Sequence, residues 1–241
     1  MLTITDQIMS LLSEFAILLP AFLLVFTFRG FFKALFAKLM GDDTAYHDGF
    51  LTLNPLVHID FIGLLVMLFF LFFLGGLLIG VVPKAYLFIL LILTGARWTY
   101  NVPINENNFR HYNLGIIFTT IAGSIGNFIL ALIFLYFIAY LPYNLLPDYI
   151  IITLAEIFRM IIELAVFFGV IDLLPIPPFD GGRLLKVILP VYMHHFIEIL
   201  ERFSLFILLI LFFIPVISDI FFRILFILSI LVKKFLLFLV I

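Results

Sequence analysis

The 241-residue chain has no cysteine, and charged residues make up only 12% of it. Without cysteine there is no disulfide framework and no thiolate metal site. Soluble domains carry roughly 25% charged residues, so the low charge excludes an ordinary soluble protein. The net charge is −2 and no basic cluster is present, so we expect no nucleic-acid partner. A cleavable signal peptide begins with basic residues. No basic residue precedes the first apolar run of this chain, so we expect the first helix to be retained.

Apolar residues dominate what is present, at 66% of the chain. A helix needs about 20 apolar residues to cross a bilayer. The sequence predicts about six such spans, near residues 8–28, 59–82, 114–141, 149–174, 203–217 and 220–232. The helical pattern of the first span continues through residues 29–40 and is closed by residues 41–43. We therefore expect an all-α, multi-pass integral membrane protein whose residues 1–241 form a single domain in the lipid bilayer. The most polar stretch, residues 95–113, is predicted to be a loop or a strand segment at one surface, with residues 102–108 as a candidate edge strand.

A proline-rich segment, residues 171–185 (IDLLPIPPFDGGRLL), interrupts the apolar runs. Its prolines end the preceding helix because proline lacks an N–H and its ring clashes one turn back. The two glycines allow a sharp turn directly after Asp180. A carboxylate at this depth is costly and usually faces a site or a partner charge. The alternative is that Asp180 only caps the following helix.

Several motifs occur in a fixed order along the chain. They are GDDTA at 41–45, LTLNPLVHID at 51–60, NVPIN at 101–105 with NFR at 108–110, AGSIGN at 122–127 and LLPIPPFDGG at 173–182. In this order and at this spacing they resemble the site-2 protease family of intramembrane zinc metallopeptidases. The resemblance covers a core of about residues 28–189, and residues 190–241 would be additional C-terminal helices.

This resemblance implies a fold with a proline-rich re-entry loop and an activity that cuts transmembrane segments of other proteins. The family's zinc is held by two histidines of an H-E-x-x-H helix and by the aspartate of the loop, here Asp180. Histidines four residues apart share one helical face, and the glutamate between them takes a proton from zinc-bound water. The family's groove and structural positions map onto Asn54, Pro55, His58, Asp60, Pro103, Asn127 and Pro177. From the residues alone, we read His58 as a hydrogen-bonded loop histidine and Asn127 as an interhelical hydrogen-bond donor.

The chain departs from the family where H-E-x-x-H belongs. Counting back from residue 41, that motif falls on residues 29–33, which read RGFFK. Arg29 and Lys33 replace both histidines and, while protonated, have no lone pair for zinc, and Gly30 replaces the glutamate. We therefore expect no zinc cofactor and assign no catalytic residue, and Asp180 is a vestigial ligand position. Asp172 stands where the family usually has an asparagine, and an ionised aspartate would repel developing negative charge.

The two substituted cations share a helical face because they are four residues apart. We hypothesise that Arg29 and Lys33 take the place of the metal and form ion pairs with Asp180 and with Asp172. The alternative is that both side chains extend along the helix to reach water. A second charged set, Glu156, Arg159 and Glu163, is expected to pair within its own helix.

Three functions remain open at this stage. The first is a non-catalytic pseudoprotease that binds a transmembrane segment of a client protein and uses residues 102–108 as an edge strand for an extended client. The second is an active intramembrane zinc metalloendopeptidase with an unconventional site. The third and weakest is a membrane transport role, suggested only by the carboxylates within the predicted spans.

Overall fold

The computed structural model describes residues 4–60, 102–140, 147–177 and 179–240. Most of each described range is helical, and no strand occurs within these ranges. The helices are α1 (Ile4–Met40), α2 (Thr44–His47), α3 (Pro55–His58), η1 (Glu106–Asn108), α6 (Tyr112–Ala139), α7 (Asp148–Asp172), η2 (Asp180–Leu184), α8 (Leu185–Ile188), η3 (Val191–Met193), α9 (His194–Arg202), α10 (Ser204–Phe213) and α11 (Pro215–Val240).

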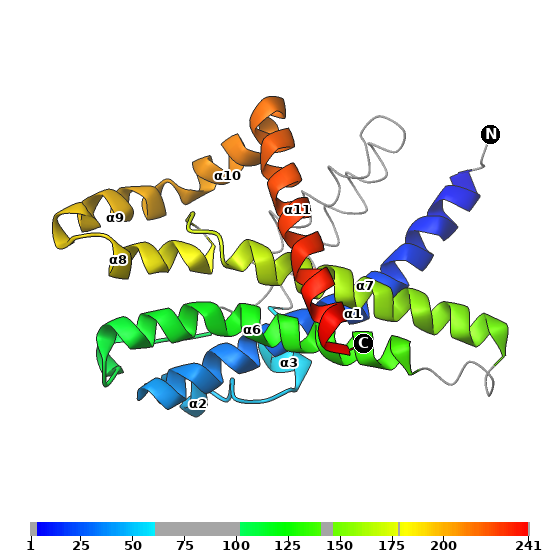
Figure 1. Ribbon diagram of the computed structural model, residues 1–241, viewed down its shortest axis with the longest axis horizontal. Coiled ribbons are helices and arrows are strands. Elements are labelled where there is room, and N and C mark those ends of the chain that lie inside the picture. Colours follow the sequence, from blue (N-terminus) through cyan, green and yellow to red (C-terminus); the bar gives the residue numbers. More distant parts are fainter. Residues whose placement is uncertain (1–3, 61–101, 141–146, 178, 241) are drawn as a thin grey trace.

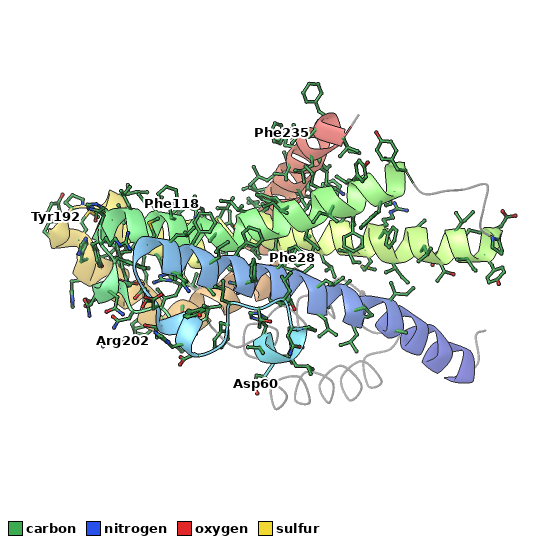
Figure 2. The ribbon with its side chains drawn as sticks, turned by 90° about the horizontal axis from the view of Figure 1, so that it is seen from below. Phe28, Asp60, Phe118, Tyr192, Arg202 and Phe235 are labelled. Atoms are coloured by element: carbon green, nitrogen blue, oxygen red, sulfur yellow. The ribbon has the colours of Figure 1, made fainter. Side chains whose placement is uncertain are left out.

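The three long helices α1, α6 and α7 lie side by side and form the centre of the protein, with α11 crossing them (Figure 1). Their apolar faces share one core that includes Val25 of α1, Leu130 of α6 and Ile161 of α7. Figure 2 shows α1 lying along α6 in a second view. Burial of apolar side chains between the helices therefore holds this bundle together.

Helices α1 and α6 approach closely because α6 has glycines at the contact. A Cβ on Gly126 would lie 2.8 Å from the backbone oxygen of Phe28, and one on Gly123 would lie 3.0 Å from Cγ of Arg29. Small residues let helix backbones approach in this way. The glycines of the 122–127 motif thus bring α6 against the part of α1 that carries Arg29.

Helix α1 ends in a glycine cap that also anchors the polar loop. Gly41 has φ +106°, and the N–H groups of Gly41 and Asp42 donate to the carbonyls of Lys38 and Ala37 at 3.0 and 2.9 Å, which is a Schellman arrangement. The buried Asp42 carboxylate then accepts hydrogen bonds from the Asn105 N–H at 2.8 Å and from Asn108 Nδ2 at 2.9 Å. The end of α1 is thereby tied to η1.

The proline-rich segment between α7 and η2 folds tightly back on itself. The Ile176 N–H donates to the Leu174 carbonyl at 2.8 Å, and the Gly182 N–H donates to Phe179 at 3.0 Å. A Cβ on Gly181 would overlap the Leu174 carbonyl oxygen, and one on Gly182 would lie 2.9 Å from the nitrogen of Pro177. Both glycines are needed because no side chain fits inside this turn.

The helices partly match the predicted spans. Two described helices are long and apolar enough to cross a membrane, Ala16–Met40 within α1 and Tyr112–Ala139. The predicted six spans stay a prediction, and the span at 59–82 lies almost entirely outside the described residues. Helix α1 continues past the first predicted span to Met40, as the helical pattern of residues 29–40 predicts. The C-terminal helix begins at Pro215 rather than at residue 220.

The predicted edge strand is wrong for the part of residues 102–108 that forms regular structure. Residues 106–108 form the 3₁₀ helix η1, whose N-cap Asn105 accepts a side-chain hydrogen bond from the Asn107 N–H at 3.1 Å. The Asn105 N–H is itself bound to Asp42. Local side-chain hydrogen bonds of this kind compete with strand pairing.

Candidate functional site

Four charged side chains from three elements meet at one place, and we call them the charge quartet: Arg29, Lys33, Asp172 and Asp180. Arg29 and Lys33 lie one turn apart on α1, Asp172 is the last residue of α7, and Asp180 begins η2. Because α7 ends at Asp172 and the loop turns back at once, both carboxylates face the same stretch of α1. Residues 143 to 151 positions apart along the chain thus become neighbours.

Every carboxylate oxygen of the charge quartet accepts a hydrogen bond. Arg29 donates from Nε to Oδ2 of Asp172 at 2.5 Å and from Nη2 to Oδ1 at 3.2 Å. Arg29 Nη2 also donates to Oδ2 of Asp180 at 2.7 Å. Lys33 Nζ donates to the two Asp180 oxygens at 2.8 and 3.0 Å. Two cations and two carboxylates therefore neutralise one another with bidentate, charge-assisted bonds.

The charge quartet is shielded from solvent. Its side chains retain between 6% and 17% of their accessible surface. Lys33 as a whole residue is 5% exposed, so it does not extend along α1 to reach water. Asp180 does not cap the following helix, because η2 has no side-chain cap and both Asp180 oxygens bind the cations of α1.

The donor set of the charge quartet does not fit zinc. Arg29 and Lys33 bring positively charged nitrogen donors to within 3.0 Å of the Asp180 carboxylate, the group that would otherwise be a ligand. A protonated ammonium or guanidinium has no lone pair to give to a metal. Among the residues that the structure describes, no group of three or more His, Cys, Asp or Glu side chains is placed to hold a metal ion.

Gly30, between the two cations, is in contact with a buried histidine. A Cβ at position 30 would overlap the imidazole ring of His58, which is 2% exposed. The ring nitrogen Nε2 lies 2.9 Å from the Thr52 carbonyl oxygen. Because a carbonyl oxygen only accepts, Nε2 is the donor. Burial lowers the pKa of His58, and the hydrogen bond to Thr52 opposes this only in part. A glutamate at position 30 would have to displace this ring.

Several of the remaining predicted positions lie in caps, turns and loops. Asn54 caps α3 by accepting the Leu56 N–H at 3.1 Å, with Pro55 at the first helical position. Pro177 is buried inside the proline-rich turn, whereas Asp60 and Pro103 are partly exposed in loops. Asn54, Pro55 and Pro177 thus shape local turns of the chain.

The prediction for Asn127 is wrong in one respect. Asn127 is fully buried in α6, yet neither amide atom makes a hydrogen bond to the described part of the protein. Ser124 and Thr120 lie one and two turns earlier on the same helix and are also buried. Their hydroxyl oxygens likewise make no hydrogen bond within the described part of the protein. Asn127 is thus buried as predicted but is not the interhelical donor that we expected.

One ion pair near the site was not predicted. Arg183 of η2 donates from Nη2 to Oε1 of Glu106 in η1 at 2.5 Å, and Tyr112 donates to the other oxygen at 3.2 Å. Burial acts to raise the pKa of Glu106, but Arg183, Lys186 and Tyr112 together outweigh burial and hold this pKa below its usual value. Opposite charges in two polar segments only weakly indicate such an ion pair, because the sequence does not show which charged side chains come into contact.

Comparison with known proteins finds one relevant similarity. The chain is 30% identical over 172 residues to a Bacillus subtilis (strain 168) protein named "Putative zinc metalloprotease YwhC". The matched part covers 68% of this chain and spans 65% of the length of that protein. No family model matches the chain, and no solved structure matches it. The similarity supports a zinc-metalloprotease-like family for this chain.

Proposed function

We propose that this chain is a pseudoprotease of the site-2 protease type, a membrane protein that keeps the scaffold of an intramembrane peptidase and binds transmembrane segments of client proteins without cutting them. The observation that carries the proposal is the charge quartet. Arg29 and Lys33 hold Asp180 by three hydrogen bonds of 2.7 to 3.0 Å at the place where the resemblance expects a metal.

The chemistry of hydrolysis has no counterpart among these residues. A metallopeptidase needs a lone-pair ligand set and a base for the attacking water. Lys33 and Arg29 offer neither while they are protonated, and Gly30 has no side chain to act as the base. Asp172 adds a carboxylate, bound to Arg29, at the position that would otherwise help to hold a reacting carbonyl. This arrangement favours a set of mutually paired charges over a catalytic site.

The scaffold itself supports a membrane-embedded binding role. Helix α6 is long and apolar enough to cross a membrane, and the bundle has a close α1–α6 contact and a folded proline-rich turn. The similarity to a protein named as a zinc metalloprotease is consistent with descent from such an enzyme. A surface shaped to receive a transmembrane helix does not depend on the metal, because packing and hydrogen bonds drive helix association in lipid.

The competing function is an active intramembrane zinc metalloendopeptidase with an unconventional ligand set. The two functions are separated by metal analysis of the purified full-length chain and by incubation with a synthetic transmembrane peptide in vesicles. We expect no stoichiometric zinc and no cleavage, with peptide binding retained. Stoichiometric zinc together with peptide cleavage, both lost in Asp180→Ala but kept in the surface control Asp219→Ala, would overturn the proposal.

A further inference from the structure

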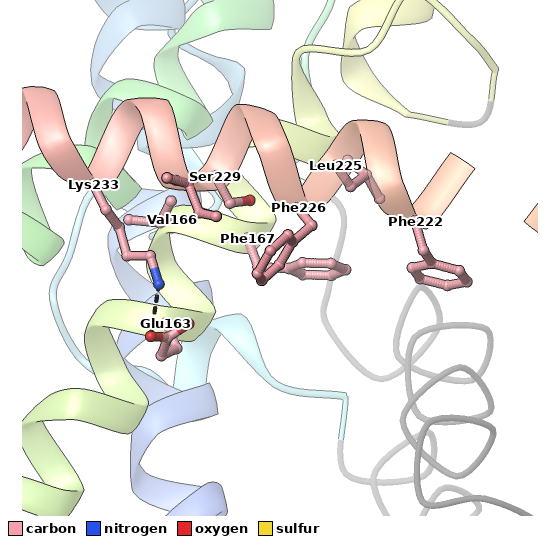
Figure 3. Close-up of a pocket in the computed structure, with 9 residues that line it drawn as sticks. Glu163, Val166, Phe167, Phe222, Leu225, Phe226, Ser229 and Lys233 are labelled. Atoms are coloured by element: carbon pink, nitrogen blue, oxygen red, sulfur yellow. Dashed lines mark hydrogen bonds and ion pairs between the residues drawn. The ribbon is translucent and has the colours of Figure 1, made fainter. Parts of the chain in front are cut away.

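A cavity of about 280 Å³ lies between α7 and α11, away from the charge quartet. Its walls are mainly apolar and include Phe167 of α7 with Phe222 and Phe226 of α11 (Figure 3). Phe226 is 66% exposed, so the cavity opens on the outer surface of the bundle. Cavities that accept ligands combine such apolar walls with a few polar groups that fix orientation.

Three polar side chains border this cavity. Lys233 Nζ of α11 donates to Oε1 of Glu163 of α7 at 2.7 Å, as the dashed line in Figure 3 shows. The Glu163 side chain is nevertheless half exposed. Ser229, one turn before Lys233 on the same face of α11, has a buried hydroxyl that makes no hydrogen bond to the described protein. The contact also corrects our expectation that Glu163 would pair within its own helix with Arg159.

Hydrogen-bonding capacity remains at the cavity on both acceptor and donor groups. Glu163 Oε2 is able to accept a further donor, the Ser229 hydroxyl is able to donate or accept, and Lys233 keeps N–H donors beyond the one that binds Glu163 Oε1. A carboxamide offers both complementary groups, an NH₂ donor and a carbonyl acceptor. Lys233 would repel a second cation, and Glu163 would repel a second carboxylate. The cavity therefore matches a neutral group that both donates and accepts.

We propose that this α7–α11 cavity is a docking site for a transmembrane helix that carries an asparagine or glutamine in its lipid-embedded stretch. The inference rests on the proposed client-binding function and specifies its partner. Apolar contact alone distinguishes poorly between a partner helix and lipid, because lipid tails are as apolar as leucine. The carboxamide, held by Glu163 and Ser229, supplies the preference, while the aromatic walls receive the apolar side chains around it.

The test compares two synthetic transmembrane peptides of about 20 leucine-rich residues, identical except for one central asparagine. Binding to the full-length chain in phosphatidylcholine vesicles is followed by energy transfer between fluorophores. Interhelical hydrogen bonds in membranes correspond to an affinity gain of about 3- to 20-fold. We expect the asparagine peptide to bind more tightly by this factor.

Two substitutions test whether the gain belongs to the cavity. Ile230→Trp places a large ring in the cavity and should abolish the preference for asparagine, whereas Ile227→Trp, on an exposed position of the same helix outside the lining, should leave it unchanged. Ser229→Ala conserves the shape and should reduce the preference without affecting the all-leucine peptide. Thermal unfolding of each variant shows that it remains folded.

The outcomes separate this inference from the proposed function. Equal binding of the two peptides to the unsubstituted chain, or a preference that survives Ile230→Trp, would overturn the docking site while leaving client binding in place. Failure of both peptides to bind would overturn both the docking site and client binding.

Discussion

The Lys33–Asp180 pair provides the most direct test of how the charge quartet is held together. The two charges lie 2.8 Å apart at their closest atoms, and their side chains retain 6% and 12% of their accessible surface. Two unit charges about 4 Å apart at an effective dielectric of about 20 interact by about 4 kcal/mol. Removing one partner of a buried pair leaves the other uncompensated, which costs about 3–5 kcal/mol.

The two single substitutions are not equivalent. In Lys33→Met, Asp180 keeps its hydrogen bond from Arg29 at 2.7 Å, so we expect a loss near the lower end, about 3 kcal/mol of unfolding free energy. In Asp180→Asn, Lys33 has no other carboxylate partner in the described residues, so we expect a loss of about 5 kcal/mol. The double variant removes both charges together and should lose no more than Asp180→Asn alone. The coupling energy is then about 3 kcal/mol.

Unfolding of the purified chain in mixed micelles, followed by far-UV circular dichroism, supplies the four free energies. The control is the Asp219–Arg223 pair of α11, whose side chains are 59% and 75% exposed. Exposed pairs contribute little, so the same cycle there should show no measurable coupling. A Lys33–Asp180 coupling energy below about 0.5 kcal/mol, the error of additivity, would refute the reasoning.

Three further predictions concern the C-terminal half of α1 and the residues packed against it or following it. Gly30→Ala should destabilise the chain by about 1–3 kcal/mol through overpacking, because a Cβ there overlaps His58; chemical denaturation measures the loss, and adding His58→Ala should recover part of it. Because burial lowers the pKa of His58 below 6.5, the unfolded chain binds a proton that the folded chain does not as pH falls. The stability due to His58 is therefore full above pH 6.5 and is lost as pH falls through the folded pKa, so the melting temperature should fall with acidification, and more shallowly in His58→Phe. Gly41→Ala should reduce the free energy of unfolding by about 1–3 kcal/mol, because the backbone there has a φ of +106°. The loss should exceed that of Gly49→Ala, because a Cβ at position 41 also meets Arg110, whereas one at position 49 meets nothing. Equal melting temperatures for these two variants would contradict the prediction.

The sequence by itself determined the helices and the elements of the site. Its apolar runs predicted the long helices at 114–141 and 149–174 to within a few residues, because burial of an apolar face is a local property of the sequence. Four-residue spacing placed Arg29 and Lys33 on one face of α1, and proline chemistry ended α7 before Asp180. Each of these inferences depends only on residues within a few turns of one another.

Tertiary structure alone decided which of these side chains meet. Arg29 binds Asp172 across 143 positions, and Glu163 binds Lys233 of another helix rather than a neighbour on its own. Asn127 has the chemistry of an interhelical donor but makes no such bond within the described residues. Periodicity fixes the face on which a side chain lies, but the partner depends on how whole helices pack, and that is set by the sum of many weak contacts between segments far apart in the chain.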